Sequence, residues 1–137
     1  MKQYYIKPRQ TQEAVKRRIN YDEDRDAMRL AGYLLMLQRQ GKISVYSHIP
    51  HETYTKSWNV KRKNKLKGVR AGVPDYIIVI NDKVIFLELK REKGGVVSKD
   101  QIEWLAATDN KITISTVAKG YQAAKDFIDR IIERNEN

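Results

Sequence analysis

Two consecutive apolar segments constrain the fold of this chain more than any other feature. Tyr76–Ile80 is a continuous run of β-branched and aromatic residues, and Val84–Lys90 is apolar except at Glu88 and Lys90. Such runs are typical of strands buried in a sheet. Asn81-Asp82, which separates them, has the composition of a tight turn. The sequence therefore predicts a β-hairpin at the centre of the fold.

The register of this hairpin brings two acidic residues together. A two-residue loop pairs Ile80 with Lys83, and counting back then places Asp75 opposite Glu88. A four-residue loop gives the same pairing, whereas a three-residue loop would place the two carboxylates on opposite faces. Directly opposed residues have their Cβ atoms about 4.5–5.5 Å apart. We therefore expect the carboxylates of Asp75 and Glu88 to be neighbours.

Two opposed carboxylates repel each other unless something compensates their charge. A divalent cation held by carboxylate oxygens would do so, with water and a substrate phosphate as its other ligands. Lys90 lies on the same strand face as Glu88, since side chains alternate along a strand. There it could orient or deprotonate a water molecule, or stabilise charge on a phosphate. The alternative is a structural salt bridge among Asp75, Glu88 and Lys90, and the residues alone leave both open.

The rest of the chain predicts an α/β domain with a mixed sheet flanked by helices. We expect residues 21–137 to form one domain, preceded by a basic arm or short helix at residues 1–20. The expected order is a helix over 21–40, a strand over 43–49 ended by Pro50, an extended basic loop or irregular hairpin over 51–70, the central hairpin, a helix from Ser98, a strand over 112–117 and a last helix. Apolar residues recur at helical spacing in the three helices. These are Ala27, Leu30, Leu34 and Leu37 in the first, Trp104 and Leu105 (with Gln101 and Thr108) in the second, and Tyr121, Ala124, Ile128 and Ile131 in the third.

The charge of the chain favours a polyanionic partner. Lys and Arg number 27 against 17 Asp and Glu, a formal net charge of +10. This excess suggests nucleic acid more than an anionic membrane surface. Tyr54 and Trp58 could stack on an unpaired base, and the less favoured alternative is a solvated charge run with Trp58 packed on the core. The cations expected to contact DNA phosphates are Lys61, Arg62, Lys63, Lys65, Lys67, Arg70 and Lys99.

Other classes of site have little support. The chain has no cysteine, which excludes disulfides, a thiolate zinc site and a cysteine nucleophile. His48 and His51 are more often ordinary residues than zinc ligands in such a setting. There is no apolar run of membrane-spanning length and no signal-peptide pattern, so the expected location is the cytosol.

The central motif resembles a nuclease signature. Gly72-Val73-Pro74-Asp75, then twelve residues, then Glu88-Leu89-Lys90 resembles the PD-(D/E)xK pattern. Residues 67–75, 86–90, 98–105 and His48-Ile49-Pro50 together look like its VRR-NUC branch, the virus-type replication–repair nucleases. The resemblance covers roughly residues 21 to 117.

The resemblance implies a restriction-endonuclease-like core and Mg²⁺- or Mn²⁺-dependent DNA hydrolysis. Asp75 and Glu88 would be metal ligands, with the Leu89 carbonyl completing the shell, and Lys90 would be the catalytic lysine. Gln101 would act at the metal or its water, and Glu23 would be the acid that the family adds from its first helix. Small stand-alone members of this branch are homodimers that cut branched DNA such as four-way (Holliday) junctions. The resemblance therefore also implies a homodimer, a branched DNA substrate and a phage origin.

Two of these roles have structural alternatives, and the function has rivals. Glu23 could instead cap a helix that begins near Asn20. Asp22 and Asp26 are less favoured candidates for the metal ligand from this helix. Gln101 completes an S-x-x-Q capping box with Ser98. The rival functions are a DNA or RNA nuclease without structural selectivity and a DNA-binding module that is catalytically inactive.

Overall fold

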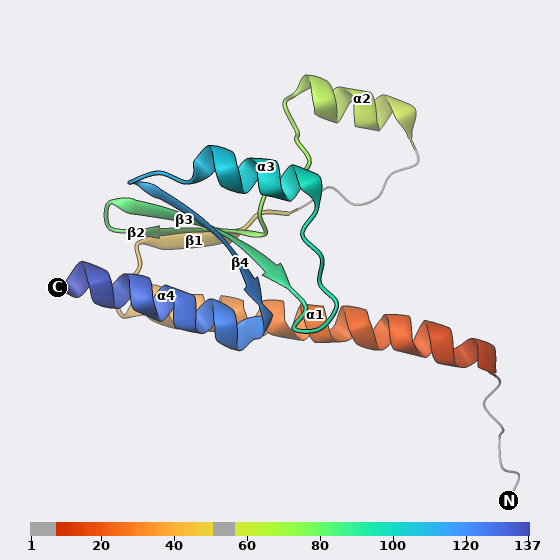
Figure 1. Cartoon of the computed structure of the whole chain (residues 1–137), viewed down its shortest axis with the longest axis horizontal. Helices are drawn as coiled ribbons and strands as arrows, with labels where there is room; N and C mark the ends of the chain where they lie inside the picture. The colour runs from red at the N-terminus through yellow and green to blue at the C-terminus, as the bar shows by residue number, and fades with distance from the viewer. Residues whose placement is uncertain (1–7, 51–56) are drawn as a thin grey trace, which may run out of the picture.

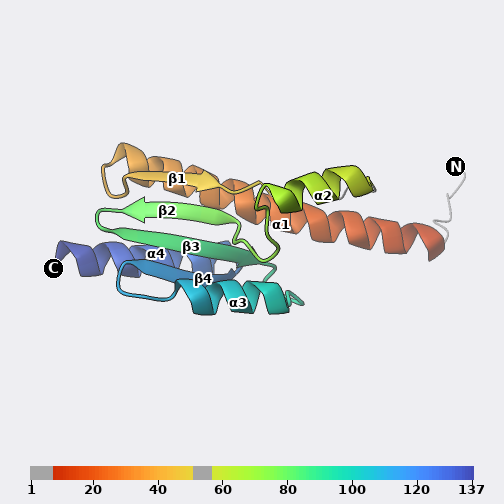
Figure 2. The ribbon, with the colours of Figure 1, turned by 90° about the horizontal axis from the view of Figure 1, so that it is seen from above.

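The computed structural model describes residues 8–50 and 57–137, which contain four helices and four strands in the order helix, strand, helix, strand, strand, helix, strand, helix. The helices are α1 (Pro8–Arg39), α2 (Trp58–Leu66), α3 (Lys99–Thr108) and α4 (Gly120–Glu136), and the strands are β1 (Val45–His48), β2 (Tyr76–Ile80), β3 (Lys83–Lys90) and β4 (Thr113–Lys119). The strands form one sheet in the order β1-β2-β3-β4 (Figure 2). The pairs β1·β2 and β2·β3 are antiparallel, and β4 runs parallel to β3. The predicted mixed α/β fold is confirmed.

The sheet is covered by helices on both faces. Helices α1 and α4 lie against one face, α3 lies over the other, and α2 stands away from the sheet (Figure 1). The apolar core fills the layer between the sheet and the pair α1 and α4. Its fully buried members include Leu30, Leu34, Ile78, Ile85, Leu87 and Ile128.

The hairpin has the predicted register. Ile80 pairs with Lys83 and Val79 with Val84, so the loop holds only Asn81 and Asp82. Asn81 has a φ of 51°, a left-handed conformation that asparagine tolerates better than most residues. The turn therefore fixes which side chains of β2 and β3 share a face.

Helices α1 and α4 are joined by a polar contact at the surface of the core. The Tyr33 hydroxyl donates to Asp129, and Lys125 Nζ lies 2.7 Å from Asp129 Oδ2. Burial raises the pKa of the Asp129 carboxyl, but the hydrogen bonds from Lys125 and Tyr33 outweigh it, and the pKa is lowered. The edge of the Tyr33 ring also meets the Tyr121 ring. These contacts fix α1 in the position from which it reaches the sheet edge.

Two predicted segments differ from the structure. The first helix begins at Pro8 and not near Tyr21, and proline suits a first helical position because its missing N–H needs no partner there. The prediction of an extended loop over 51–70 is wrong at α2, where the Ser57 side chain accepts a hydrogen bond from the Val60 N–H and caps the helix. Residues 1–7 and 51–56, with His51 and Tyr54, lie outside the described part of the chain. Among the helices that are described, none has the length and apolarity required to cross a membrane.

Candidate active site

Asp75 and the end of β3 meet at one edge of the sheet. Asp75 directly precedes β2, whose first residue, Tyr76, pairs with Leu87. The Asp75 Oδ2 atom accepts a hydrogen bond of 2.8 Å from the Leu89 backbone N–H. The carboxylate therefore continues the pattern of the ladder past its last backbone pair, and it lies beside the strand that carries Glu88 and Lys90.

Glu88 is a buried acid with two polar partners. It is 5% exposed, and within residues 23–50 and 57–137 no other charged side chain is buried. Lys90 Nζ lies 3.1 Å from Glu88 Oε1, and Gln101 Nε2 donates to the same oxygen at 2.5 Å. Burying a carboxylate is costly unless it is paired and hydrogen-bonded. Lys90 and Gln101 provide that compensation, and they also fix the direction in which the carboxylate points.

Gln101 completes the predicted capping box and also contacts Glu88. Its Oε1 accepts from the Ser98 N–H at 2.8 Å, and its own N–H donates to Ser98 Oγ at 3.2 Å, which completes the capping box of α3. The amide nitrogen remains available and donates to Glu88. The start of α3 therefore presents one side chain to both the helix cap and the buried acid.

Glu23 and Asp75 line the same small cavity. The cavity has a volume of about 100 Å³ and is lined by Glu23, Asp24, Ala27, His48, Asp75, Tyr76 and Leu89. Glu23 itself is exposed, although four residues before Ala27 it falls on the helical stripe of Ala27, Leu30 and Leu34 and a buried position would be expected. The capping alternative is excluded, because α1 begins well before Asn20. Of the weaker alternatives, Asp26 lines a different cavity.

Tyr76 ties α1 to this edge of the sheet. Its hydroxyl donates to the Ala27 carbonyl at 3.2 Å, one helical turn after Glu23. Burial raises the pKa of Tyr76 to about 12, and the negative charge of Asp75 adds to the effect. The ring of His48 packs edge-on against Tyr76 with the ring centres 5.1 Å apart. From the sequence, His48 had no expected role in the site, and its place in the wall of this cavity was not predicted.

The oxygen atoms at this edge are donors of the type that hard divalent cations prefer. They are the carboxylates of Glu23 and Asp75, which line the cavity, and the carboxylate of Glu88, the residue before Leu89 on β3. Oxygen-only donor sets suit Mg²⁺ or Mn²⁺, which retain several waters. Within residues 8–50 and 57–137, no three His, Cys, Asp or Glu side chains are gathered closely enough to form a metal centre by themselves. A cation here would therefore rely on backbone, water and phosphate oxygens as well.

Two glycines allow neighbouring loops to close on the site. A Cβ on Gly72, whose φ is +84°, would lie 2.3 Å from the Asp100 carbonyl oxygen, so the segment before Asp75 packs directly on the start of α3. A Cβ on Gly95 would lie 2.9 Å from Lys90 Cβ. The chain that follows β3 therefore folds back onto Lys90.

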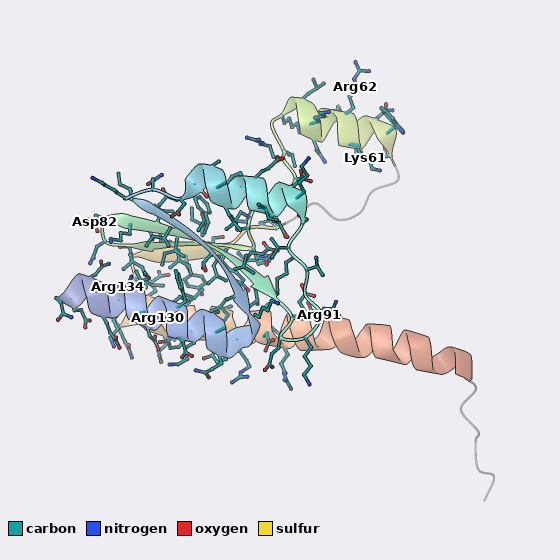
Figure 3. All side chains as sticks on the ribbon, in the orientation of Figure 1. Lys61, Arg62, Asp82, Arg91, Arg130 and Arg134 are labelled. Carbon is teal, nitrogen blue, oxygen red and sulfur yellow. The ribbon has the colours of Figure 1, made fainter. Side chains whose placement is uncertain are left out.

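The basic residues predicted to bind DNA are at the surface. Helix α2 has no buried residue, and Lys61 and Arg62 project from opposite sides of it in Figure 3. Trp58 is 81% exposed, so the alternative that it packs on the core is wrong. The whole predicted set is exposed, comprising Lys61, Arg62, Lys63, Lys65, Lys67, Arg70 and Lys99. Phosphate contact and base stacking by these side chains remain predictions.

Comparison with known proteins identifies the fold. No protein-family model and no curated protein matches the chain. Among solved structures, a VRR_NUC domain protein matches with a TM-score of 0.61 and 21% sequence identity, over 82% of this chain and 88% of the other. The chain therefore has the VRR-NUC fold, a restriction-endonuclease-like α/β core, as its sequence predicted.

Proposed function

We propose that this protein is a metal-dependent DNA endonuclease whose active site comprises Asp75, Glu88 and Lys90. The observation that carries the proposal is the buried Glu88 carboxylate, which contacts Lys90 and Gln101 and directly precedes Leu89, whose backbone N–H donates to Asp75. The VRR-NUC fold supports the proposed nuclease function, because it is the fold of a nuclease domain.

Asp75, Glu88 and the Leu89 carbonyl would hold Mg²⁺ or Mn²⁺, and Glu23 would reach it directly or through a water. The cation, when bound, supplies positive charge that activates water and stabilises charge on the phosphate oxygens and the leaving group. Lys90 projects from the end of β3 with a side chain that is 19% exposed. Its ammonium can therefore orient the attacking water or stabilise the phosphate in the transition state. Gln101 keeps Glu88 in place and is a positioning residue.

The proposed substrate is DNA, and more specifically branched duplex DNA. The net charge of +10 and the cations of α2 favour a polyanion. An exposed tryptophan at the start of α2 suits unpaired bases at a branch. Two symmetric cuts across a four-way junction require two sites related by a twofold axis, so a homodimer is part of the proposal.

The test is cleavage of a synthetic four-way junction, matched linear duplex, flap and RNA substrates, with Mg²⁺, with Mn²⁺ and without metal. The proteins are wild type, Lys90→Ala and a matched control, Lys83→Ala, which removes the same charge from the other end of β3. We expect metal-dependent cleavage of the junction that is lost in Lys90→Ala and kept in Lys83→Ala. Cleavage of every substrate would contradict the structural selectivity but keep the nuclease. Junction binding without cleavage under any condition would contradict the proposal that the protein is an enzyme and would favour a DNA-binding module.

A further inference from the structure

A second, larger cavity lies next to the proposed active site and is lined with cations. It has a volume of about 600 Å³ and lies between α1, the segment that follows β3, and the start of α4. Five basic side chains line it, from three separate parts of the chain. They are Arg25, Arg29, Arg91, Lys93 and Lys119.

This cavity adjoins the catalytic lysine. Arg91 is the residue after Lys90, and Lys119 pairs with Lys90 across the parallel strands β3 and β4. Figure 3 shows Arg91 at the end of the sheet where α1 passes beneath it. A polymer held at Lys90 would therefore reach the cavity within a short distance.

The cations of the cavity are not neutralised by its acids. Asp26, Glu92 and Asp126 also line it, which leaves five positive charges against three negative ones. Within the described part of the chain, no ion pair joins these acids to the five cations. Asp126 instead accepts a hydrogen bond from Gln122. Cations that share a concave surface repel each other and attract anions into it.

Two further features favour an anion. The guanidinium of Arg29 lies 4.2 Å from the centre of the Tyr121 ring, which holds it at the cavity wall. The N-terminus of α4 also opens here, and its N-cap Lys119 makes no side-chain cap hydrogen bond. The first turn of α4 contains no acid, so its backbone N–H groups add to the attraction that the cations create.

We propose that this cavity binds the sugar-phosphate backbone of the DNA strand next to the phosphodiester that is cut. The inference rests on the proposed function for its ligand, since it takes DNA to be the substrate. The volume of the cavity is in the range of sites that hold a drug-sized ligand and suits a stretch of backbone better than one isolated phosphate. The cavity would thereby set the position of the strand relative to Lys90.

The test compares two triple variants that lose equal charge. The cavity variant is Arg25→Gln, Lys93→Gln and Lys119→Gln, all exposed side chains. Arg91 and Arg29 are kept because one follows Lys90 and the other packs on Tyr121. The control is Lys111→Gln, Arg130→Gln and Arg134→Gln, exposed cations at the opposite end of β4 and α4. Circular dichroism confirms that each variant is folded.

The measurement is the dissociation constant for duplex and junction DNA across a series of KCl concentrations, without divalent metal so that no strand is cut. Each phosphate contact contributes about 0.9 to the slope of log affinity against log salt. We expect the cavity variant to lose about two to three units of slope, and the control to keep the wild-type slope. Equal slopes for wild type and cavity variant would overturn the inference, as would equal losses in both variants.

Two further arms separate the possible explanations. If the loss of slope occurs only with 5′-phosphorylated DNA and not with 5′-hydroxyl DNA, the cavity holds a terminal phosphate and the proposal of an internal backbone segment is overturned. If wild type fails to bind DNA at all, the proposed function itself fails. Wild-type binding with an unchanged slope in the cavity variant contradicts only the inference drawn here.

Discussion

The side-chain amide of Gln101 hydrogen-bonds at one end to the N-cap of α3 and at the other end to the buried carboxylate of Glu88. Its oxygen accepts from the Ser98 N–H, and its nitrogen donates to Glu88 Oε1. The position of Glu88 is therefore coupled to the start of a helix on the other side of the β3–α3 loop. The two ends of this amide can be separated by mutation.

Gln101→Glu should preserve the helix cap and impair the proposed active site. A glutamate keeps the oxygen that accepts from Ser98, but it places a like charge against Glu88 where a donor stood. Loss of a partner that orients a ligand costs about 10- to 100-fold in activity or metal affinity. We expect a fall of this size in the rate of cleavage, measured at saturating DNA, and a matching fall in Mn²⁺ affinity.

Ser98→Ala is the complementary control. It removes the hydroxyl that accepts from the Gln101 N–H at 3.2 Å, and losing such a cap costs about 0.5–2 kcal/mol of stability. We expect a lower free energy of unfolding in urea with little change in cleavage rate. A larger activity loss in Ser98→Ala than in Gln101→Glu would show that the cap, and not the contact with Glu88, is what matters.

Gly95→Ala should impair Lys90 without unfolding the protein. The new Cβ would lie 2.9 Å from Lys90 Cβ and 3.0 Å from the Arg91 carbonyl oxygen, so the loop or the lysine must shift. A displacement of about 1 Å at a reacting group can cost about 100-fold in rate. Gly32→Ala is the control, because nothing lies within 4 Å of its added Cβ. It should retain full activity and gain up to about 1 kcal/mol of stability in its helix.

Tyr76→Phe should reduce stability in a pH-dependent way. The variant loses the hydrogen bond from the Tyr76 hydroxyl to the Ala27 carbonyl, worth about 1 kcal/mol. The pKa of Tyr76 is raised from 10.0 to about 12 by burial and by Asp75. The folded state therefore keeps the proton more tightly than the unfolded state, and this contribution is complete below pH 10 and is lost as the pH rises toward 12. Urea unfolding should show a stability difference between wild type and variant at pH 8 that shrinks above pH 10. A constant difference across this range would contradict the raised pKa.

Trp58→Ala should weaken binding to branched or single-stranded DNA more than to duplex. The ring is exposed at the start of α2, and stacking on an unpaired base is worth about 1–3 kcal/mol. Fluorescence anisotropy with the two kinds of DNA measures the ratio of affinities. Leu66→Ala, an equally exposed apolar change at the end of the same helix, is the control. Equal losses in both variants, or a loss on duplex alone, would argue against stacking.

The sequence predicted the centre of the fold because the hairpin is specified locally. A left-handed Asn81 and a two-residue loop leave one register for β2 and β3, and that register brings Asp75 and Glu88 to one edge. The capping box at Ser98 is equally local. Both features lie within short stretches of chain, where pattern and turn chemistry determine the structure.

Helix α2 and the basic cavity could not be predicted in the same way. The run of Lys and Arg in α2 resembles a solvated loop, although Ser57 as an N-cap and the high helix propensity of Lys, Arg and Leu were a usable signal. The cavity brings together Arg25, Arg91 and Lys119, which are distant in sequence. Their proximity follows from how α1 and α4 pack on the sheet, which no local pattern specifies. The exposure of Glu23 has the same origin, since it depends on where α1 extends past the sheet edge.

The most direct test of the account is single-turnover cleavage of a four-way junction in Mn²⁺ by wild type and Glu88→Gln. Glutamine preserves the size of the buried side chain but removes the charge that would bind the cation and pair with Lys90. Asp82→Asn is the control, a neutralised acid in the exposed turn at the far end of the same hairpin (Figure 3). The account predicts a loss of about 10³-fold in Glu88→Gln, the scale of losing an electrostatic group at a reaction centre, with Asp82→Asn unchanged. Cleavage by Glu88→Gln at the wild-type rate would contradict it.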